Sequence, residues 1–494
     1  MLQATSSLLA HRVQNASLLI LSLVFLPLDT LILIVSLFIS KVIPSKVESN
    51  RNVALRDAES TRRTVLVTGI GMTKGLVLAR LFYEAGHDVI GADFEPDGAL
   101  VCGRVSSSLK RFCRLQKPDT RSGAAPYIQS LLDIVVREKV ELWISCSGVA
   151  SAVEDGMAKE VVEARTDCKA IQFDVKTTQT LHEKHSFMEH TKSIGLTIPE
   201  THEITSRAAV QNILRNAPPG RKYIMKTIGV DDSVRGDLTL LPKKTDLETS
   251  EHIARLKISV DSPWILQEFI KGKEYCTHSL VIRGQVKAFV ACPSAELLMH
   301  YTALPAQSAL SLAMLEFTKV YAANGGVDFT GHLSFDFMVR DEDTTDPRNI
   351  VLYPIECNPR AHTAVALFNG TTAMVGAYLS VFEDPHGQTD TTQIVRPLTN
   401  DKYYWTGHDL VTLVILPALS FLTLSGTSIT GLWEGYATFL NHLLLWKDGT
   451  YALWDPLPWW WLYHVYWPMR FWGCIRQGRK WSRVNVSTAK MFEC

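Results

Sequence analysis

The stretch that decides the fold is Gly331-His-Leu-Ser-Phe-Asp336-Phe-Met-Val-Arg340, followed after a polar turn by Ile350-Val-Leu-Tyr-Pro-Ile-Glu356-Cys-Asn358-Pro-Arg360. Both halves have the composition of strands. Because side chains alternate along a strand, Glu356 and Asn358 point to the same face, and a hairpin centred near Asp346 places Asp336 about opposite Glu356. Two carboxylates and an amide then converge, which predicts a cation site.

The type of ligand atom indicates which cation this site prefers. Directly opposed like charges on a sheet are unfavourable unless a cation lies between them. Carboxylate and amide oxygens suit Mg²⁺, with Mn²⁺ as an alternative, and they leave coordination positions for phosphate oxygens. The other interpretation, surface acids on an exposed hairpin, is disfavoured by Phe335, Phe337 and Ile355, which indicate a buried face.

Two lysines and a loop precede the hairpin. Lys184 lies in His-Glu-Lys-His-Ser-Phe, and Lys226 ends a strand-like segment before the loop Ile228 to Gly236. Lysine supplies a compact positive charge for phosphate, and a loop of Gly, Asp and Ser can close over a triphosphate and exclude water. Taken singly, each lysine would be interpreted as a solvated surface residue, so the prediction depends on their order in the chain.

A nucleotide-binding edge is predicted between the lysines and the hairpin. An apolar strand that begins at Trp264 runs through Gln267 and Glu268 to Ile270, and a polar turn leads on to Glu274. A backbone edge exposed here could bind adenine, and Glu274 could accept hydrogen bonds from both ribose hydroxyls.

The residues upstream of 170 have a β-α-β pattern. The strand 65–68 is followed by Gly69-x-Gly71-x-x-x-Gly75, an amphipathic stretch from Leu76 to Ala85 and a strand that ends at Asp93. Further α/β units follow, so we expect a parallel, doubly wound domain that ends near residue 170. The glycine spacing departs from the dinucleotide-binding fingerprint, which favours a structural or substrate-facing turn over a site for NAD or FAD.

Bulk properties limit the class of protein. A chain of 494 residues is long enough for two to four domains. Lys plus Arg and Asp plus Glu both number 50, and a net charge of zero removes the main electrostatic argument for a nucleic-acid partner. The nine cysteines are scattered without a C-x-x-C pair, which indicates a reducing compartment and suggests neither a disulfide framework nor a zinc site.

Both ends of the chain predict contact with a membrane. Leu18 to Ile43 is apolar and long enough to cross a bilayer or, because of Pro27 and Asp29, to dip into it and return; a pair of core helices is the alternative. The segment from Lys46 to Arg63 is interpreted as a linker. A C-terminal stretch dense in Trp, Tyr and Pro, followed by basic residues, is typical of an interfacial belt. We expect a protein anchored or monotopic on the cytosolic face of a membrane.

Taken in chain order, these motifs resemble the ATP-grasp superfamily, and the domain before them resembles its usual N-terminal partner, as in carbamoyl phosphate synthase. The likeness covers roughly residues 64 to 380, although the loop before Gly236 has fewer glycines than in many members. It implies that ATP is held by Lys184, Lys226, Gln267, Glu268, Ile270 and Glu274, that Mg²⁺ is bound by Asp336, Glu356 and Asn358, and that Arg360, Lys226 and His362 act on the reacting groups.

A narrower likeness is to the mycosporine-glycine synthases and their fungal-type relatives. It rests on the hydrophobic N-terminus with Leu-Pro-Leu-Asp29, the segment Asp232-Ser-Val-Arg235, the run from Glu356 to His362-Thr-Ala and the Trp-rich tail. It implies a ligase that phosphorylates the enol oxygen of 4-deoxygadusol and joins an amino acid, typically glycine, through a C–N bond. His362, Arg235 and Arg340 would then bind substrate, although His362 could equally be a packed structural histidine.

The expected fold is an α/β pre-ATP-grasp domain followed by an α+β ATP-grasp domain, with membrane-associated ends. The domain boundaries that we expect are 1–60 for the anchor and linker, 61–170, 171–385, and 386–494 for the Trp-rich region. Three other functions stay open: a carboxylate–amine ligase that uses an acyl phosphate, a membrane scaffold that binds ATP without chemistry, and an NAD-dependent oxidoreductase.

Overall fold

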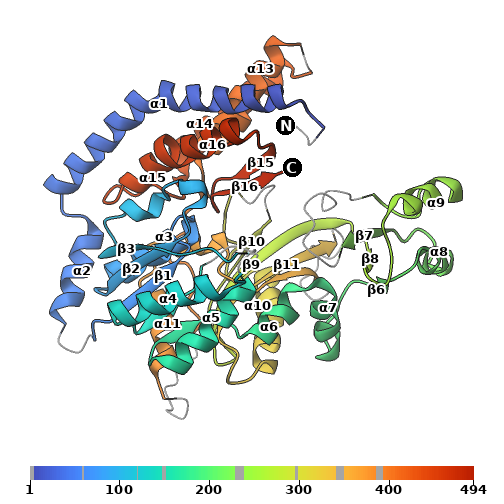
Figure 1. The fold of residues 1–494 in the computed structure, drawn as a ribbon, viewed down its shortest axis with the longest axis horizontal. Coiled ribbons are helices and arrows are strands. Elements are labelled where there is room, and N and C mark those ends of the chain that lie inside the picture. Colours follow the sequence, from blue (N-terminus) through green and yellow to red (C-terminus); the bar gives the residue numbers. More distant parts are fainter. Residues whose placement is uncertain are drawn as a thin grey trace.

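The computed structural model describes residues 5–57, 61–119, 121–146, 152–227, 239–294, 299–340, 350–384, 393–424 and 426–494. The three largest sheets follow one another across the molecule (Figure 1), the first in blue at the left, a four-stranded sheet in the middle and a three-stranded sheet with two helices at the right. The expected loop from Ile228 to Gly236, with Arg235, and the turn near Asp346 lie outside the described residues.

The first sheet is parallel, with strand order β3-β2-β1-β4-β5, as the β-α-β pattern predicts. Its strands are β1 (Thr64–Thr68), β2 (Asp88–Asp93), β3 (Arg111–Arg114), β4 (Leu142–Ile144) and β5 (Lys169–Ile171). Its helices are α3 (Thr73–Glu84), α4 (Ala125–Glu138) and α5 (Ala152–Arg165). The apolar residues of β1 and β4 are fully buried, because helices cover both faces of a doubly wound sheet.

The other two sheets are antiparallel. The small one has the order β6-β8-β7, from Thr201–Ile204, Trp264–Glu268 and Tyr223–Thr227. The larger one has the order β10-β9-β11-β12, from Gln285–Pro293, Gly272–Ile282, Gly331–Arg340 and Tyr353–Asn358. The helices around them are α6 (Val175–His182), α7 (Lys184–Ser193), α8 (Arg207–Asn216), α9 (Asp246–Arg255), α10 (Ala309–Asn324) and α11 (Ala373–Leu379).

The two faces of the four-stranded sheet differ, because side chains alternate along each strand. One face is apolar: Phe335 and Phe337 pack with Phe317 of α10 in the same buried cluster. The opposite face carries Asp336 and is directed toward the first sheet and the C-terminal region. This face therefore forms the floor of the candidate site.

The C-terminal region packs against the first sheet. Its elements are β13 (Tyr403–Tyr404), α12 (Thr406–Asp409), the π-helical turn η8 (Leu410–Ile415), α13 (Leu416–Leu422), α14 (Ile429–Leu445), β14 (Lys447–Asp448), α15 (Leu457–Trp461), η9 (Leu462–Tyr466), α16 (Trp467–Gln477), β15 (Trp481–Asn485) and β16 (Lys490–Glu493). In Figure 1, α15 and α16 lie between the first sheet and α1 (Leu8–Val42).

Part of the Trp-rich segment lies in the core, although the sequence predicted an interfacial belt. Trp459, Tyr466 and Trp467 are buried, while Trp472 is exposed. Trp460 donates a hydrogen bond to Thr30 of α1 at 3.1 Å. These aromatic side chains fill the space between α1 and the first sheet.

The N-terminal segments also differ from expectation. Leu8–Val42 is one continuous helix that includes Pro27, so it neither dips and returns nor forms a helix pair. Among the described residues it is the one helix long and apolar enough to cross a membrane, by length and composition. The segment expected to be a linker contains α2 (Lys46–Arg56), which starts with a capping box of Ser45 and Glu48.

Candidate functional site

The hairpin β11–β12 places the predicted metal ligands together. Asp336 pairs with Glu356 in the antiparallel register, as expected from the strand periodicity. The Asn358 amide donates a hydrogen bond to Asp336 at 3.0 Å, and Arg360 donates one to the Asn358 oxygen at 2.8 Å. The donor set is thus two carboxylates and an amide oxygen, which fits Mg²⁺.

Like charges also lie close together in this cluster. Burial, followed by the neighbouring charges of Glu356 and Glu274, raises the pKa of Asp336 well above its usual range. A carboxylate in this position is costly unless a positive charge compensates it. A divalent ion bound between Asp336 and Glu356 would supply that charge.

Both predicted lysines face this cluster from neighbouring elements. Lys184 begins α7, and its ammonium lies 3.7 Å from the Glu356 carboxylate. Lys226 lies in β7 and donates a hydrogen bond to the Gln267 side chain at 2.7 Å. Burial, followed by the charge of Lys184, lowers the pKa of Lys226 to about 8. Two cations and two carboxylates therefore lie at the junction of the two antiparallel sheets.

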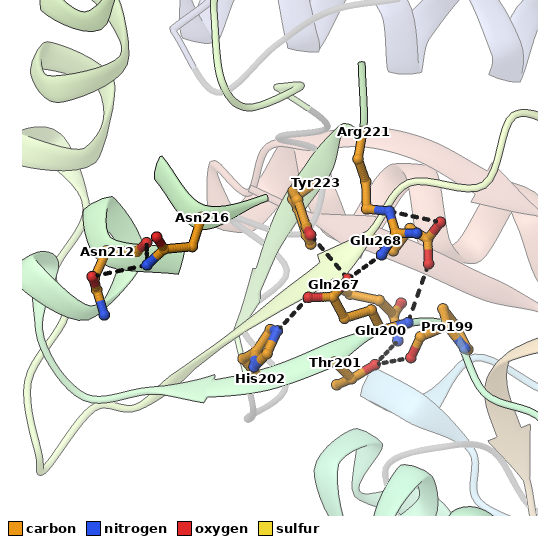
Figure 2. A network of polar contacts seen from close by, with 10 residues as sticks. All are labelled: Pro199, Glu200, Thr201, His202, Asn212, Asn216, Arg221, Tyr223, Gln267 and Glu268. Carbon is orange, nitrogen blue, oxygen red and sulfur yellow. Dashed lines mark hydrogen bonds and ion pairs between the residues drawn. The ribbon is translucent and has the colours of Figure 1, made fainter. Parts of the chain in front are cut away.

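The strand β8 is fixed at this junction by a polar network (Figure 2). Glu200 accepts hydrogen bonds from Tyr223 at 3.0 Å and from Arg221, and Gln267 donates one to Thr201 at 3.1 Å. The backbone N–H of Glu268 donates to the Glu200 carbonyl at 2.8 Å. That N–H is therefore already engaged, which limits the backbone groups that Glu268 can offer to a nucleotide.

Three other predicted residues lie around the same junction. Ile270 is buried in the turn between β8 and β9. Glu274 is exposed at the start of β9, where it accepts a hydrogen bond from Ser294 at 2.7 Å. Arg340, predicted as a substrate ligand, instead contacts Glu268 at 3.1 Å and lies over the Tyr353 ring. Arg340 therefore lies beside Glu268, the last residue of β8.

His362 is buried and partly structural. Its Nδ1 accepts a hydrogen bond from the Ala364 N–H at 3.2 Å and caps the turn that follows. One of its ring nitrogens also lies within 4.8 Å of ligand atoms of Asp336 and Cys276. Burial, followed by the charge of Arg360, lowers the pKa of His362 well below its usual range, so the ring is neutral. Its geometry fits a packed histidine at the edge of the site.

Lys74 is a site residue that the sequence interpretation missed. It lies in the first turn of α3, is almost fully buried, and donates a hydrogen bond to the Ala361 carbonyl at 3.0 Å. Burial, followed by the charge of Arg360, lowers its pKa to about 7. Two cations from different domains thus meet beside the Asp336 cluster. The signal in the sequence is a lysine directly before Gly75, within the glycine turn.

The glycine turn itself is filled by protein atoms, as the structural interpretation predicts. Gly69 has a φ of +70°, and an added Cβ there would lie 2.5 Å from the Cys146 carbonyl. A Cβ on Gly75 would lie 2.4 Å from the Gly69 carbonyl. Asp93 accepts a hydrogen bond from the Gly71 N–H at 2.7 Å. These contacts explain the glycines by close packing of the turn and assign Asp93 to it.

Comparison with known proteins finds similarity at the level of structure. No protein-family model matches the chain, and no match exists among curated proteins. The L-amino acid ligase from Bacillus licheniformis is 13% identical over 68% of this chain and 78% of its own, with a TM-score of 0.45. The biotin carboxylase from Campylobacter jejuni, in complex with β-γ-ATP, is 14% identical over 67% and 73%, with a TM-score of 0.48.

A third similar structure is the N5-carboxyaminoimidazole synthetase from Staphylococcus aureus with ADP, 15% identical over 62% and 72%, with a TM-score of 0.43. These three likenesses are at low identity, with TM-scores below 0.5. The function is therefore inferred from the side chains described above.

Proposed function

We propose that this protein is an ATP-dependent ligase that forms a C–N bond. The observation that carries the proposal is the pairing of Asp336 with Glu356, with Asn358 beside them and Lys184 and Lys226 facing them. Phosphoryl transfer requires positioning and neutralisation of charge on oxygen, and this cluster supplies both. A scaffold that binds ATP without chemistry would have less need of this metal-ligand set.

Each residue has a defined task in this proposal. Asp336, Glu356 and Asn358 would hold Mg²⁺, which neutralises charge on the phosphate oxygens when bound. Lys184 and Lys226 bind the α and β phosphates, and the segment from Gln267 to Glu274 binds adenine and ribose. Arg360, which contacts Asn358, and Lys74, which feels the charge of Arg360, orient the acceptor oxyanion toward the γ-phosphoryl group.

The reaction then proceeds in two steps. The acceptor oxygen attacks the γ-phosphorus and ADP leaves; the amine next attacks the carbon that bears the new phosphate ester, and inorganic phosphate leaves. The second step must outrun hydrolysis, which favours a site covered from water. The burial of Lys74 supports such a covered site.

The acceptor and the amine are the finer part of the proposal. The sequence likeness favours a 4-deoxygadusol-like enol as acceptor and glycine as amine. The ATP-binding residues serve an acyl phosphate equally well, so a carboxylate–amine ligase is the second candidate. Incubation with MgATP and either 4-deoxygadusol or a carboxylate, with and without glycine, separates them by phosphate release and the mass of the product.

The test of the reaction class is Glu356→Gln, which keeps the size of the side chain and removes its charge. We expect amine-dependent ADP release to fall by about 10²-fold or more, because charge stabilisation in the transition state is lost. The matched control is Glu316→Gln, which changes an exposed glutamate of α10. Retained turnover in the Glu356 variant, with a wild-type melting temperature, would contradict the assignment.

We also propose that the protein lies on a membrane surface. One stripe of α1 is polar and recurs every seven residues: Asn15, Ser22, Asp29 and Ser36. Each contacts the C-terminal region, through Trp481 at 2.8 Å, the Tyr463 carbonyl at 2.9 Å, His464 at 2.9 Å and Tyr451 at 2.7 Å respectively. The helix is therefore held along the body by its polar side.

The other side of α1 is apolar and exposed, and it includes Ile20, Leu31 and Phe38. The apolar helices α13 and α14 expose Leu422 and Leu444 as well. A bilayer would cover these residues, and a helix whose polar side is held by protein lies along the membrane more readily than across it. This arrangement supports monotopic association.

Flotation of the full-length protein with phospholipid vesicles tests this location. We expect the double substitution Leu31→Glu and Phe38→Glu to weaken vesicle binding at least about tenfold, because two charges would enter the acyl region. Leu247→Glu is the matched control, since Leu247 is an exposed leucine of α9, away from α1. Equal binding of the double variant and the wild type would exclude this face as the docking surface.

A further inference from the structure

A second cluster of metal-ligand side chains lies outside the ATP site. His300 belongs to the segment between β10 and α10, Asp409 ends α12, and His442 lies on α14. One ligand atom of each lies within 4.8 Å of the others. The two Asp409 oxygens contact His300 Nε2 at 2.8 Å and His442 Nδ1 at 2.6 Å.

The backbone holds these three segments in place. Tyr301, next to His300, exchanges two backbone hydrogen bonds of 2.9 Å with Tyr403. The strand β13, which contains Tyr403, pairs with β14, which directly follows α14. The His442 ring is packed against Trp446, with ring centroids 4.4 Å apart. The cluster is thus built from three distant parts of the chain. Contacts other than those among His300, Asp409 and His442 hold these parts in place.

The charge of the cluster calls for a cation. The Asp409 side chain is 0% exposed, and its ion-pair partners among the described residues are the two imidazoles. A buried carboxylate is costly unless a positive charge compensates it. A divalent ion supplies the charge, provided that each ring carries its proton on the nitrogen that faces away from Asp409.

The donor set selects the metal. Two imidazole nitrogens and one carboxylate oxygen suit Zn²⁺, with bonds of about 2.0 to 2.2 Å that place tetrahedral ligand atoms about 3.4 Å apart. The present separations need shifts of about 1 Å to reach that geometry. The His300 side chain is partly exposed, so a water molecule can occupy the fourth position. Mg²⁺ prefers an all-oxygen set and belongs to the Asp336 cluster.

We propose that His300, Asp409 and His442 bind Zn²⁺ as a structural ion that fixes the C-terminal helical hairpin, α13 and α14, to the catalytic body. Tyr301 transmits the effect to the site, because its ring packs against His362 and Trp405, with centroids 5.9 Å away in both cases. This zinc site goes beyond the proposed ligase activity and does not depend on it.

The experiment is a metal titration of the full-length protein in detergent after treatment with a chelator. Zn²⁺ or Co²⁺ is added in the presence of excess Mg²⁺, which occupies the oxygen ligands of the Asp336 cluster. We expect about one tight equivalent, a visible Co²⁺ spectrum typical of tetrahedral coordination, and a melting temperature raised by Zn²⁺.

Two variants locate the binding. His300→Ala and Asp409→Asn should each weaken Zn²⁺ binding at least about tenfold and abolish the rise in melting temperature. His202→Gln is the control, because His202 pairs with one carboxylate, Glu200, at 2.8 Å. Unchanged binding by both cluster variants would overturn the proposal.

The wild-type protein alone also decides the matter if the variants fail to fold. X-ray absorption of the zinc-loaded protein should show two imidazole ligands per ion. Failure of the wild type to retain Zn²⁺, or coordination by oxygen atoms alone, would overturn the proposal and leave a hydrogen-bonded His–Asp–His contact.

Discussion

A buried ammonium beside a guanidinium is expensive for folding, and Lys74 lies in this position beside the half-buried Arg360. Like charges disfavour each other, and burial removes the hydration of the Lys74 ammonium. A bound anion between the two cations offsets their repulsion, so such a pair is suited to an anion site. This is the physical reason for placing the acceptor oxyanion between Lys74 and Arg360.

The first prediction is that Lys74→Met changes the pH dependence of stability. The pKa of Lys74 is lowered from 10.5 to about 7 in the folded protein, so the unfolded chain binds more protons between these values. The unfolding free energy of the wild type should therefore rise with pH across this window, by up to about 1.4 kcal/mol per pH unit relative to the variant. Below pH 7 the two should run parallel.

Denaturant unfolding of both proteins from pH 6 to pH 10 measures this difference. A difference between wild type and variant that stays constant from pH 7 to pH 10 would show that folding does not lower the pKa of Lys74.

The second prediction separates Lys74 from Lys226. Lys226→Met should raise the KM for ATP, because a phosphate contact is lost, while Lys74→Met should leave ATP binding unchanged and lower acceptor-dependent turnover by about 10²-fold. Isothermal titration with a non-hydrolysable ATP analogue and steady-state kinetics with varied acceptor measure the two effects. The same loss of ATP affinity in both variants would place Lys74 at the phosphates.

Strand periodicity makes some site residues predictable and leaves others hidden. Asp336, Glu356 and Asn358 share a face because of alternation within two adjacent strands, which is local information. Lys74 reaches the site from a different domain, so its position depends on tertiary packing. Arg340 carries a charge that could bind a substrate, which is why the sequence predicted that role. In the structure it forms an ion pair with Glu268 of the neighbouring sheet, a contact that depends on tertiary packing.

Among the elements, α1 has two opposite sides with separate tasks. A helix with a polar stripe inside an apolar surface inverts the usual order of a soluble protein, where the apolar side faces the core. Composition alone predicted an apolar segment. The seven-residue spacing of Asn15, Ser22, Asp29 and Ser36 is the local signal that indicates contact with protein on one side.

The third prediction concerns the polar side of α1. Asp29→Ala leaves His464 without its carboxylate partner and should weaken the attachment of α1 by about 1 to 3 kcal/mol. Limited proteolysis near Ile43, where α1 ends, should accelerate, while Leu28→Ala, at an exposed neighbouring position, should leave the rate unchanged. Equal cleavage of both variants would mean that the polar stripe does not hold the helix.

The linker that proved to be a helix shows the limit of periodicity. The segment Lys46–Arg56 is polar, so no apolar stripe marks it, and its start is indicated instead by the Ser45–Glu48 capping box. Arg51 fixes it to the body through the Tyr83 carbonyl at 2.5 Å and the Tyr83 ring. The capping residues could have predicted the helix from the sequence. The contacts of Arg51 with Tyr83 could be known only from the fold.

At the scale of the whole molecule, a buried polar network joins the C-terminal region to the domain of the first sheet. Arg80 of α3 forms a buried ion pair with Asp455 at 2.9 Å and donates to the Thr450 carbonyl at 2.9 Å. Ser106 and the Ser107 N–H also donate to Asp455, at 2.6 and 2.8 Å. Residues more than 340 positions apart therefore share one fully satisfied polar network. Sequence periodicity carries no information about contacts at such a separation.

The fourth prediction tests this long-range contact. Asp455→Ala leaves the Arg80 guanidinium buried without its carboxylate, and the side chains are only 4% and 0% exposed. Removing one partner of a buried ion pair costs about 3 to 5 kcal/mol, because the remaining charge is uncompensated. We expect a large loss of thermal stability and of activity together, since Arg80 and Lys74 lie on the same helix.

The matched control is Arg62→Ala, which breaks the ion pair with Asp88 at a position where the arginine is 54% exposed. Exposed pairs contribute about 0 to 1 kcal/mol, so this variant should unfold close to the wild type. If Asp455→Ala unfolded no earlier than Arg62→Ala, the C-terminal region would be an independent appendage. If Asp455→Ala unfolded in one early transition with loss of ATP turnover, the first sheet and the C-terminal helices would form one cooperative unit that holds Lys74 against Arg360.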